Sequence, residues 1–216
     1  MKNIPRIFQD TNLESGITIP VSREIVHYLS HVMRGVECLV FNNGDEFHAK
    51  LDGNNLIVGE KTAHTDPSVD ITLYFSPIKK LDDMLNMATQ MGVVKFVPVV
   101  MERTVANHIN WERMKKIIVE ASEQSNRNSV PSIAEPIKFS ELPFSDLIFA
   151  DERAAYGRDI AELSQNAKNV LVGPEGGFSD NEFKTLDDNG AHGLSLGKTI
   201  LRAELAAPIA IAKILK

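Results

Sequence analysis

The chain has 216 residues, of which 43% are hydrophobic and 24% charged, and its formal net charge is −6. This length suits one large domain or two modest ones, with enough residues to bury a core. The single cysteine, Cys38, excludes an intramolecular disulfide and is typical of a reducing cytoplasm. No apolar run approaches membrane-spanning length, and the first five residues lack the apolar core of a signal peptide. We therefore expect a soluble, cytoplasmic protein with no membrane partner.

The acidic balance argues mildly against nucleic acid, because contacts to phosphates need lysine and arginine. Residues 1–66 hold 6 basic and 9 acidic side chains, and residues 67–216 hold 17 and 20. Neither part is a basic module, although net charge says little about one local face. An RNA-binding protein of this composition would have to cluster its arginines.

Residues 1–66 have the pattern of a small β-rich module. Ser22 is placed to cap a helix whose apolar residues, Ile25, Leu29, Val32 and Met33, fall on one side. Strand-like runs follow at 37–41, 46–51 and 55–60, separated by NNGD and DGNN, which are typical of hairpin turns. The polar stretch 61–70, which contains a proline, is the predicted linker.

Beyond the linker, predicted strands and helices alternate. The sequence predicts strands at 71–77, 95–100, 146–151, 169–174 and 193–197, and helices at 81–91, 111–124, 179–189 and from about 200 to the end. Ser179 and Glu182 have the spacing of an S-x-x-E capping box, and Gly190 is placed to end the same helix. This alternation predicts an α/β domain with a mostly parallel sheet covered by helices.

A glycine-rich turn, GPEGG at 173–177, joins a predicted strand to a predicted helix. It lacks the G-x-G-x-x-G dinucleotide pattern, and the downstream GKT at 197–199 lacks the upstream glycine of a P-loop, since His192 stands there. Glu175 would also repel a phosphate across a short gap. The turn therefore favours a flat or cationic ligand at the carboxyl end of a parallel strand. The alternative is a tight turn with a solvated glutamate.

A second glycine turn, at Gly197, precedes a C-terminal helix that is apolar almost all round. Such a helix is normally buried in a core or an interface. Arg202 and Glu204 nevertheless lie in its predicted first turn. Two charges in so apolar a helix are either paired or functional, and residues two apart face different ways and cannot pair with each other.

These two segments, LVGPEGGFSDNE at 171–182 and LSLGKTILRAELA at 194–206, resemble the C-terminal motifs of the bacterial 16S ribosomal RNA uridine-N3 methyltransferases, members of the knotted SPOUT class. Earlier segments are similar to that family in the same order: IPRIF, HVMRG, FNNGDEFHAKL, MGVVKFVPVVMERTV and EASEQSNRNSVP. The resemblance covers nearly the whole chain. Departures are Gln90 and Met91 in place of Glu-Leu, and Ala203 and Leu205 in place of two threonines, whose hydroxyls are lost.

The resemblance implies an N-terminal PUA-like barrel that binds RNA (1–66) and a C-terminal SPOUT α/β domain with a deep trefoil knot (67–216). It also implies a homodimer through the C-terminal helix region and S-adenosylmethionine bound in the knot. Because this methyl donor is cationic at sulfur and carries no phosphate, Glu175 becomes tolerable. Backbone groups of the 196–201 loop would contact the adenine edge. The implied cofactor-binding residues are Phe149, Ala150, Asp151, Glu152, Leu171, Val172, Gly173, Pro174, Glu175, Gly176, Gly177, Leu194, Ser195, Leu196, Gly197, Ile200 and Leu201.

Uracil N3 becomes nucleophilic only after it loses its proton, so we expect catalytic roles for two residues. Arg202 is the candidate for stabilising charge on the uracil oxygens or for holding the nucleotide phosphate, with pairing in a dimer interface as the alternative. Glu204 is the candidate base, with a structural role or a water base as the alternatives. The expected RNA-binding residues, facing 16S ribosomal RNA in the assembled small subunit, are Arg6, Arg34, Lys79, Arg103, Glu123, Gln124 and Arg127.

Other interpretations stay open. His27 and His31 have the spacing of a metal-binding pair, but no third ligand or H-E-x-x-H pattern accompanies them, so we expect no metal. The chain could instead be a ribosome-binding paralogue that has lost catalysis, because two threonines are replaced. A third alternative is a knotted methyltransferase that acts on another RNA base.

Overall fold

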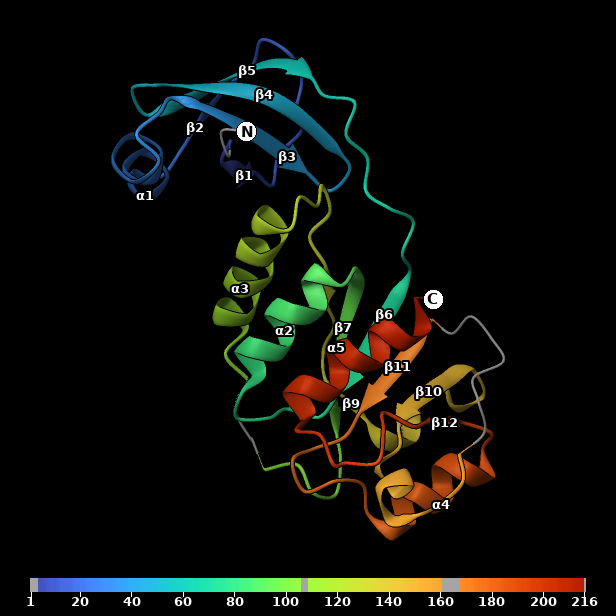
Figure 1. Cartoon of the computed structure of the whole chain (residues 1–216). Coiled ribbons are helices and arrows are strands. Elements are labelled where there is room, and N and C mark those ends of the chain that lie inside the picture. The colour runs from blue at the N-terminus through green and yellow to red at the C-terminus, as the bar shows by residue number, and fades with distance from the viewer. Residues whose placement is uncertain (1–3, 106–108, 161–167, 216) are drawn as a thin grey trace. The chain divides into compact units, whose positions relative to one another are not determined.

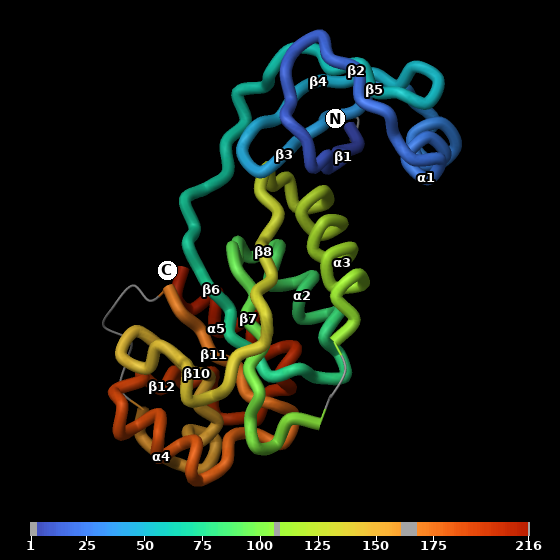
Figure 2. Tube along the Cα trace, turned by 180° about the vertical axis from the view of Figure 1, so that it is seen from behind, coloured from blue at the N-terminus to red at the C-terminus, as the bar shows by residue number. Residues whose placement is uncertain are grey.

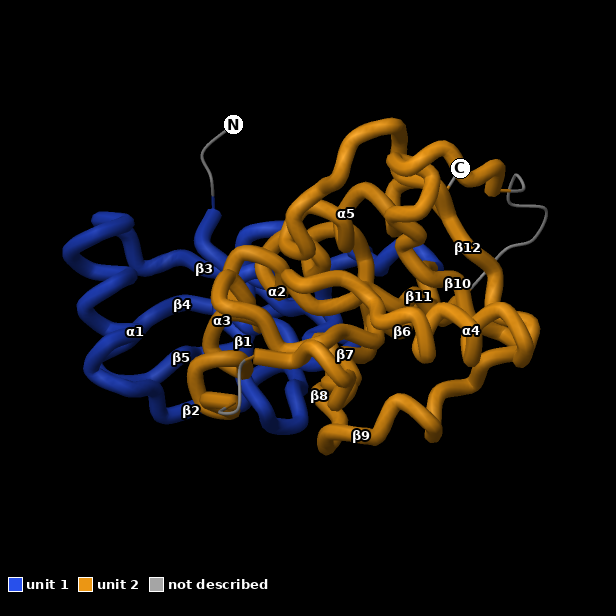
Figure 3. Tube along the Cα trace, turned by 90° about the horizontal axis from the view of Figure 1, so that it is seen from below, with its two compact units in different colours: residues 1–68, 119–130 blue, residues 69–118, 131–216 orange. Residues whose placement is uncertain are grey.

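The computed structural model describes residues 4–105, 109–160 and 168–215. The chain divides into two compact units, coloured separately in Figure 3: unit 1 comprises Met1–Ser68 and Val119–Val130, and unit 2 comprises Val69–Ile118 and Pro131–Lys216. Each unit is described by itself. The first division lies close to the boundary expected after residue 66, but no sequence pattern indicates that residues 119–130 belong with the N-terminal unit.

Unit 1 is built on a five-stranded sheet in the order β1-β3-β4-β5-β2 (Figure 1). Its strands are β1 (Arg6–Phe8), β2 (Thr18–Pro20), β3 (Glu37–Asn42), β4 (Asp45–Asp52) and β5 (Asn55–Lys61). The antiparallel trio β3–β4–β5 confirms the three predicted strands. The two edge strands were not predicted, because three residues are too few to show an alternating pattern. Alternate residues of β4 are buried against a core that includes Leu29, Val40 and Leu56.

The predicted helix after Ser22 is present but changes type. In α1 (Arg23–His27) the Ser22 hydroxyl accepts a hydrogen bond from the Ile25 N–H at 3.3 Å, which confirms the predicted cap. A π-helical turn, η1 (Tyr28–Val32), follows directly. Its wider turn rotates the later residues, so Leu29 is fully buried whereas Val32 is 59% exposed. The expectation that Val32 shares one apolar side with Leu29 is therefore wrong.

Unit 2 contains a seven-stranded sheet in which all pairings are parallel. Six strands follow the order β12-β10-β11-β6-β7-β8, and β9 pairs with β7 (Figures 1 and 2). The strands are β6 (Ile71–Phe75), β7 (Val93–Val100), β8 (Ser132–Ile133), β9 (Ile137–Lys138), β10 (Leu147–Ala150), β11 (Asn169–Val172) and β12 (His192–Leu194). The helices are α2 (Leu81–Gln90), α3 (Trp111–Gln124, which ends in unit 1), α4 (Asp180–Asp188) and α5 (Ala203–Ile214). Short 3-10 turns occur at η2 (Phe139–Glu141), η3 (Phe144–Asp146) and η4 (Glu152–Tyr156). The predicted mostly parallel α/β domain is confirmed.

Helices cover both faces of this sheet. On one face α5 packs against α2, β10 and β11. On the other face Leu186 of α4 joins a core with Phe149, Leu171 and Phe178. Because successive strand residues point to opposite faces, Ala150 and Val172 point toward the α5 side instead. This alternation decides which residues of β10 and β11 are available to a ligand.

The helix termini follow their local sequence. At α4 the Ser179 hydroxyl accepts from the Glu182 N–H at 3.1 Å, and the Glu182 carboxylate accepts from the Ser179 N–H at 2.8 Å, which confirms the capping box. Gly190 follows the helix end with a φ of +79°, as predicted. The last helix begins at Ala203 rather than near residue 200, because Arg202 has extended dihedral angles and forms its N-cap. Within the described ranges, no helix has both the length and the apolar character needed to cross a membrane.

Candidate functional site

A cavity of about 570 Å³ opens at the carboxyl ends of β10, β11 and β12 in unit 2. Its walls are the loops that follow these three strands, the residues before α2 and the first turn of α5. Ligands of open α/β sheets bind at this edge, and the volume lies within the usual range for small-molecule sites. The lining residues are Lys79, Lys80, Ala150, Asp151, Glu152, Tyr156, Val172, Gly173, Pro174, Glu175, Gly176, Gly177, Leu196, Gly197, Thr199, Ile200, Leu201, Arg202, Ala203, Glu204 and Ala206.

The structure brings together most of the residues expected to bind a cofactor, with four exceptions. Phe149 and Leu171 are fully buried on the α4 face, because strand alternation turns them away from the cavity. Leu194 is buried in β12. Ser195 has an indirect position: its carbonyl accepts from the Lys213 ammonium at 2.7 Å, and its hydroxyl accepts from the Gly197 N–H at 3.4 Å.

Two glycines make room for the carboxylates at the end of β10. A Cβ at Gly177, whose φ is +69°, would lie 2.3 Å from Oε1 of Glu152, and a Cβ at Gly193 would lie 2.6 Å from Oδ2 of Asp151. Heavy atoms do not approach so closely, so any side chain at either position would displace a carboxylate. Glycine therefore suits position 177 for two reasons: its backbone adopts a positive φ, and it leaves space for the Glu152 carboxylate.

The carboxylates differ in their partners. Asp151, buried to 3% exposure, pairs with the Arg153 guanidinium at 2.6 Å, and Arg153 continues to Asp187 at 2.8 Å. Glu152 accepts a hydrogen bond from the Phe178 N–H at 3.3 Å. Burial raises the pKa of Glu152, and the charge of Asp151 also raises it, against the lowering effect of backbone N–H donors and Arg153.

The glycine loop 173–177 is held from two sides. Oε1 of Glu175 accepts from the Lys79 N–H at 3.0 Å, which joins this loop to the residues before α2. One guanidinium nitrogen of Arg103 donates to the carbonyls of Gly176 and Phe178 at 2.9 and 3.0 Å. The carboxylate that the sequence placed at the centre of this loop thus has a structural partner.

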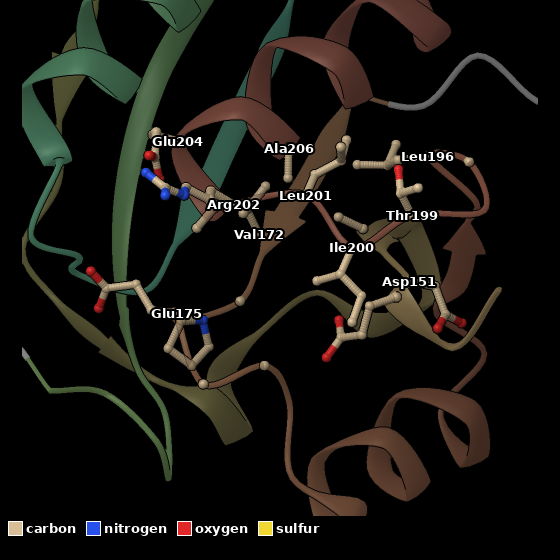
Figure 4. A pocket seen from close by; sticks show the side chains of 18 of the residues that line it. Asp151, Val172, Glu175, Leu196, Thr199, Ile200, Leu201, Arg202, Glu204 and Ala206 are labelled. Atoms are coloured by element: carbon tan, nitrogen blue, oxygen red, sulfur yellow. The ribbon is translucent and has the colours of Figure 1, made fainter. Parts of the chain in front are cut away.

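The candidate catalytic pair lies at one end of the cavity. In Figure 4, Arg202 and Glu204 lie at one side of the view and Asp151 at the other, with Val172, Leu201 and Ile200 between them. Arg202 is exposed at the N-cap of α5. The Glu204 side chain is 13% exposed, and its Oε1 lies 3.8 Å from the Lys80 ammonium. As expected, Glu204 takes a partner other than Arg202, since no ion pair between the two occurs in the described part of the chain.

The expected RNA-binding residues divide into two groups. Arg34, Gln124, Lys79 and Arg103 are exposed. Arg6 is 7% exposed, because its guanidinium bonds to Glu46 at 2.9 Å, to the Arg127 carbonyl at 2.9 Å and to Asn128 at 2.5 Å. Arg127 is 8% exposed and donates to the Ser129 hydroxyl at 3.0 Å, and Glu123 is half-buried and accepts from the Phe8 N–H at 2.9 Å. Arg6 and Arg127 belong to the interior of unit 1 and are not exposed on its surface as the RNA assignment expected.

Five cavity-lining residues were not singled out as site residues from the sequence. Thr199, Ala203 and Ala206 lie within or beside the GKTILRAELA motif, so the motif itself carried a signal. Lys80 and Tyr156 carried none, because each is far along the chain from both glycine loops. His27 and His31 stack with ring centroids 4.8 Å apart, and no group of three or more potential metal ligands occurs among the residues with described positions.

Comparison with known proteins adds independent findings. A family model described as an RNA methyltransferase domain matches residues 65–215. The chain is 32% identical to a ribosomal RNA small subunit methyltransferase E from Rickettsia conorii, over 97% of this chain and 94% of that protein. It is 35% identical to one from Aquifex aeolicus, over 65% of this chain and 66% of that protein.

Solved structures show the same architecture. A crystal structure of a ribosomal RNA small subunit methyltransferase E from Neisseria gonorrhoeae, bound to S-adenosyl methionine, is similar with a TM-score of 0.83 at 27% identity. The similarity covers 97% of this chain and 96% of that one. A structure from Legionella pneumophila has the same fold with a TM-score of 0.78 at 21% identity.

Proposed function

This chain belongs to the RNA methyltransferase family, and we propose that it transfers a methyl group from S-adenosylmethionine to N3 of a uridine in 16S ribosomal RNA. The observation that carries this proposal is the cavity between two glycine loops at the carboxyl ends of parallel strands. A relative with the same fold along its whole length binds S-adenosyl methionine.

The cavity suits this cofactor in size and chemistry. Its centre is apolar, with Val172, Leu196, Ile200 and Leu201 available to a flat adenine ring. Exposed backbone groups of the 196–201 loop can bond the ring edge, because Gly197 has no atom within 4 Å of the position that a Cβ would take. The carboxylates Glu152, Glu175 and Glu204 around this centre suit a cationic ligand and disfavour a phosphate.

The charged end of the cavity suits the nucleotide. When bound, S-adenosylmethionine supplies a sulfonium methyl group, which uracil N3 accepts as the carbon–sulfur bond breaks. The Arg202 guanidinium donates hydrogen bonds to a uracil oxygen on which negative charge develops. A carboxylate oxygen of Glu204 accepts the N3 proton, directly or through one water, while Lys80 holds that carboxylate in place. Holding both reactants in attack geometry is worth about 7–11 kcal/mol.

The RNA partner is 16S ribosomal RNA in the assembled small subunit. N3 lies on the Watson–Crick edge, so the uridine must be unpaired or turned out of its helix. Exposed cations that border the cavity, Lys79 and Arg202, and the exposed Arg34 and Gln124 are the residues we assign to RNA. Arg103 is exposed but already bonds the glycine loop, so its RNA contact would be made by the remaining guanidinium nitrogens.

The domain types that we propose are those of the same family. We assign unit 1, which contains residues 1–66, to a PUA-like domain and unit 2 to a SPOUT domain with a deep trefoil knot. The all-parallel sheet, and the return of α5 from the 195–202 loop onto α2, β10 and β11, support the second assignment.

A homodimer through α5 completes the assembly. The buried side of α5 carries Ala203, Ala207, Ala210 and Ile211, whereas Leu205 on another side is 44% exposed. Ile200, just before the helix, is 60% exposed. Large apolar side chains exposed beside a cavity suit a surface that a second copy covers.

The activity is tested by incubating small ribosomal subunits that lack the modification with the protein and radiolabelled S-adenosylmethionine. An N3-methyl group blocks base pairing, so primer extension maps the product to one uridine. Arg202→Ala should lower kcat at least about 100-fold, the range for removing one charge-stabilising donor. Arg158→Ala removes an exposed arginine that pairs with Asp187 outside the cavity and is the matched control. Label that appears on another base, or activity that Arg202→Ala preserves, would refute the assignment.

A further inference from the structure

Glu152 differs from the other carboxylates of the cavity in its combination of partners and burial. Asp151 pairs with Arg153 at 2.6 Å, Glu175 accepts from the Lys79 N–H at 3.0 Å, and Glu204 lies 3.8 Å from the Lys80 ammonium. Within the described residues, neither Glu152 nor Glu175 has a cation within ion-pairing distance, and each accepts hydrogen bonds only from backbone N–H groups; Glu175 is exposed to solvent, whereas Glu152 is half-buried. It is thus a half-buried carboxylate at the cavity wall whose negative charge lacks a full counter-charge.

The position of this carboxylate is fixed by the glycine loop. Oε1 accepts from the Phe178 N–H at 3.3 Å and occupies the place that a Cβ of residue 177 would need. The Phe178 N–H therefore holds Glu152, and Glu152 and Gly177 both line the cavity. A side chain that the fold holds in place loses little conformational entropy when it meets a ligand.

The charges around Glu152 come from four elements. On η4 are Asp151, itself neutralised, and Arg153, which is engaged by two aspartates. The glycine loop adds Glu175 and the guanidinium of Arg103, bonded to its backbone. Across the cavity, the residues before α2 provide Lys79 and Lys80, and the start of α5 provides Arg202 and Glu204. Asp151 and Glu204 thus have cationic partners. Glu175, which has none, is exposed to solvent, so Glu152 is the half-buried acid of this set without a cation.

We propose that Glu152 recognises the positive charge of the methyl donor, so that the site prefers sulfonium S-adenosylmethionine over the neutral sulfide left after transfer. This inference rests on the proposed function. An attraction between unit charges a few ångströms apart is stronger in a partly desolvated site than in water, so a carboxylate distinguishes the two ligands there. Backbone donors and apolar walls contact both ligands equally and cannot do so. Loss of this attraction on transfer also favours release of the product.

Proton release should accompany donor binding. Burial raises the pKa of Glu152 in the free protein, and a bound cation favours the ionised form. The carboxyl therefore loses a proton on binding at pH values around its raised pKa, where the free protein still holds part of it. Because the ionised carboxylate binds the cation more tightly, affinity for the donor increases as pH rises through that window and then levels off.

Isothermal titration calorimetry of S-adenosylmethionine and S-adenosylhomocysteine tests the inference. Glu152→Gln keeps the shape and an acceptor for the Phe178 N–H but removes the charge. We expect it to weaken S-adenosylmethionine binding about 10-fold, which is about 1.4 kcal/mol, and to change S-adenosylhomocysteine binding less than about 2-fold. Glu112→Gln, the same change at a side chain that is 89% exposed on α3, is the control and should alter neither.

Repeating the titrations at weakly acidic pH in two buffers of different ionisation enthalpy counts the protons released. The wild type should release a fraction of a proton with S-adenosylmethionine, and Glu152→Gln none. Equal weakening of both ligands in Glu152→Gln, or unchanged preference, overturns the inference while leaving the proposed function intact. If the wild type binds neither ligand, the proposed function fails and the inference with it. Melting curves of each variant show whether it is folded, and Glu152→Asp, which keeps the charge, should retain part of the preference.

Discussion

At the scale of single residues, the site depends on pairs of small and charged side chains that meet only in space. Gly177 and Glu152 are 25 positions apart in the sequence, yet a Cβ at position 177 would force the Glu152 carboxylate to move. Gly193 and Asp151 repeat the arrangement on β12. The glycine loop therefore serves the neighbouring strand end as well as its own turn.

Gly177→Ala tests this requirement. The new Cβ would lie 2.3 Å from Oε1 of Glu152, and the φ of +69° adds strain. Gly190→Ala is the control, because φ is +79° there and no atom lies within 4 Å. We expect the control to lose about 1 kcal/mol of unfolding free energy in urea and Gly177→Ala at least about twice that. Equal losses would mean that only backbone strain matters.

The residue types in the sequence predicted the residues that line the cavity better than the residues exposed for RNA binding. Glycines, a capping box and an arginine next to a glutamate are local patterns, and their positions in the structure follow from neighbouring residues. Arg6 and Arg127 show where prediction from residue type fails, because the sequence does not distinguish a buried arginine from an exposed one. Only the fold brings Glu46 and Asn128 to Arg6.

At the scale of elements, each β-strand and α-helix with four or more residues overlaps a strand or helix expected from the sequence, whereas the five-residue 3-10 helix η4 was not predicted. β1, β2, β8, β9 and β12 have two or three residues each, and of these only β12 was predicted, as part of a longer run. Hydrogen bonding to a neighbour defines such short strands, and their own sequence carries no periodicity. The π-helical turn in η1 likewise has no sequence pattern that we could have used.

The contact between the end of α3 and β1 should depend on pH. Burial raises the pKa of Glu123 to about 7, above its value of about 4.3 in an unfolded chain. The folded form thus binds this proton more tightly, so stability is highest below about pH 4.3 for this group and falls as pH rises to about 7. Glu123→Gln keeps an acceptor for the Phe8 N–H and removes the charge.

We therefore expect Glu123→Gln to be more stable than the wild type at pH 8, by about 1–3 kcal/mol, and nearly equal to it only below about pH 4.3. Urea unfolding at several pH values measures the difference, with Glu112→Gln on the exposed start of α3 as the control. A gain that is the same at every pH would contradict the assignment of the proton to Glu123.

At the scale of the whole molecule, chain order and spatial order differ. Residues 119–130 leave unit 2 and complete unit 1, where the Asp66 carboxylate accepts from the Asn128 N–H at 2.6 Å and the Ser129 N–H at 3.0 Å. A boundary drawn once along the sequence cannot represent a unit made of two segments. The knot that we assign to unit 2 likewise cannot be predicted from sequence periodicity, since no periodicity encodes a chain crossing.

Arg6→Met tests the interior role of this arginine in unit 1. The guanidinium neutralises Glu46, which is 3% exposed. It also donates to the backbone carbonyl of Arg127 and to the side-chain amide oxygen of Asn128, both in the 119–130 segment. Leaving Glu46 buried without its partner should cost about 3–5 kcal/mol in urea unfolding. The double variant Arg6→Met, Glu46→Leu should recover part of that loss. Arg34→Met, at an exposed arginine, should cost little, and wild-type stability of Arg6→Met would show that the network is unimportant.

The central claim, that the cavity of unit 2 binds S-adenosylmethionine, is tested most directly by calorimetric titration of the wild type beside Gly197→Trp. The indole would enter open space at the cavity wall, so binding should weaken at least about 10-fold. Gly53→Trp, also at a positive-φ glycine with no atom within 4 Å of its Cβ position, lies in unit 1 and should bind as the wild type does. Saturable binding that only Gly197→Trp impairs is the predicted result. No binding by the wild type, or equal binding by Gly197→Trp, would contradict the account.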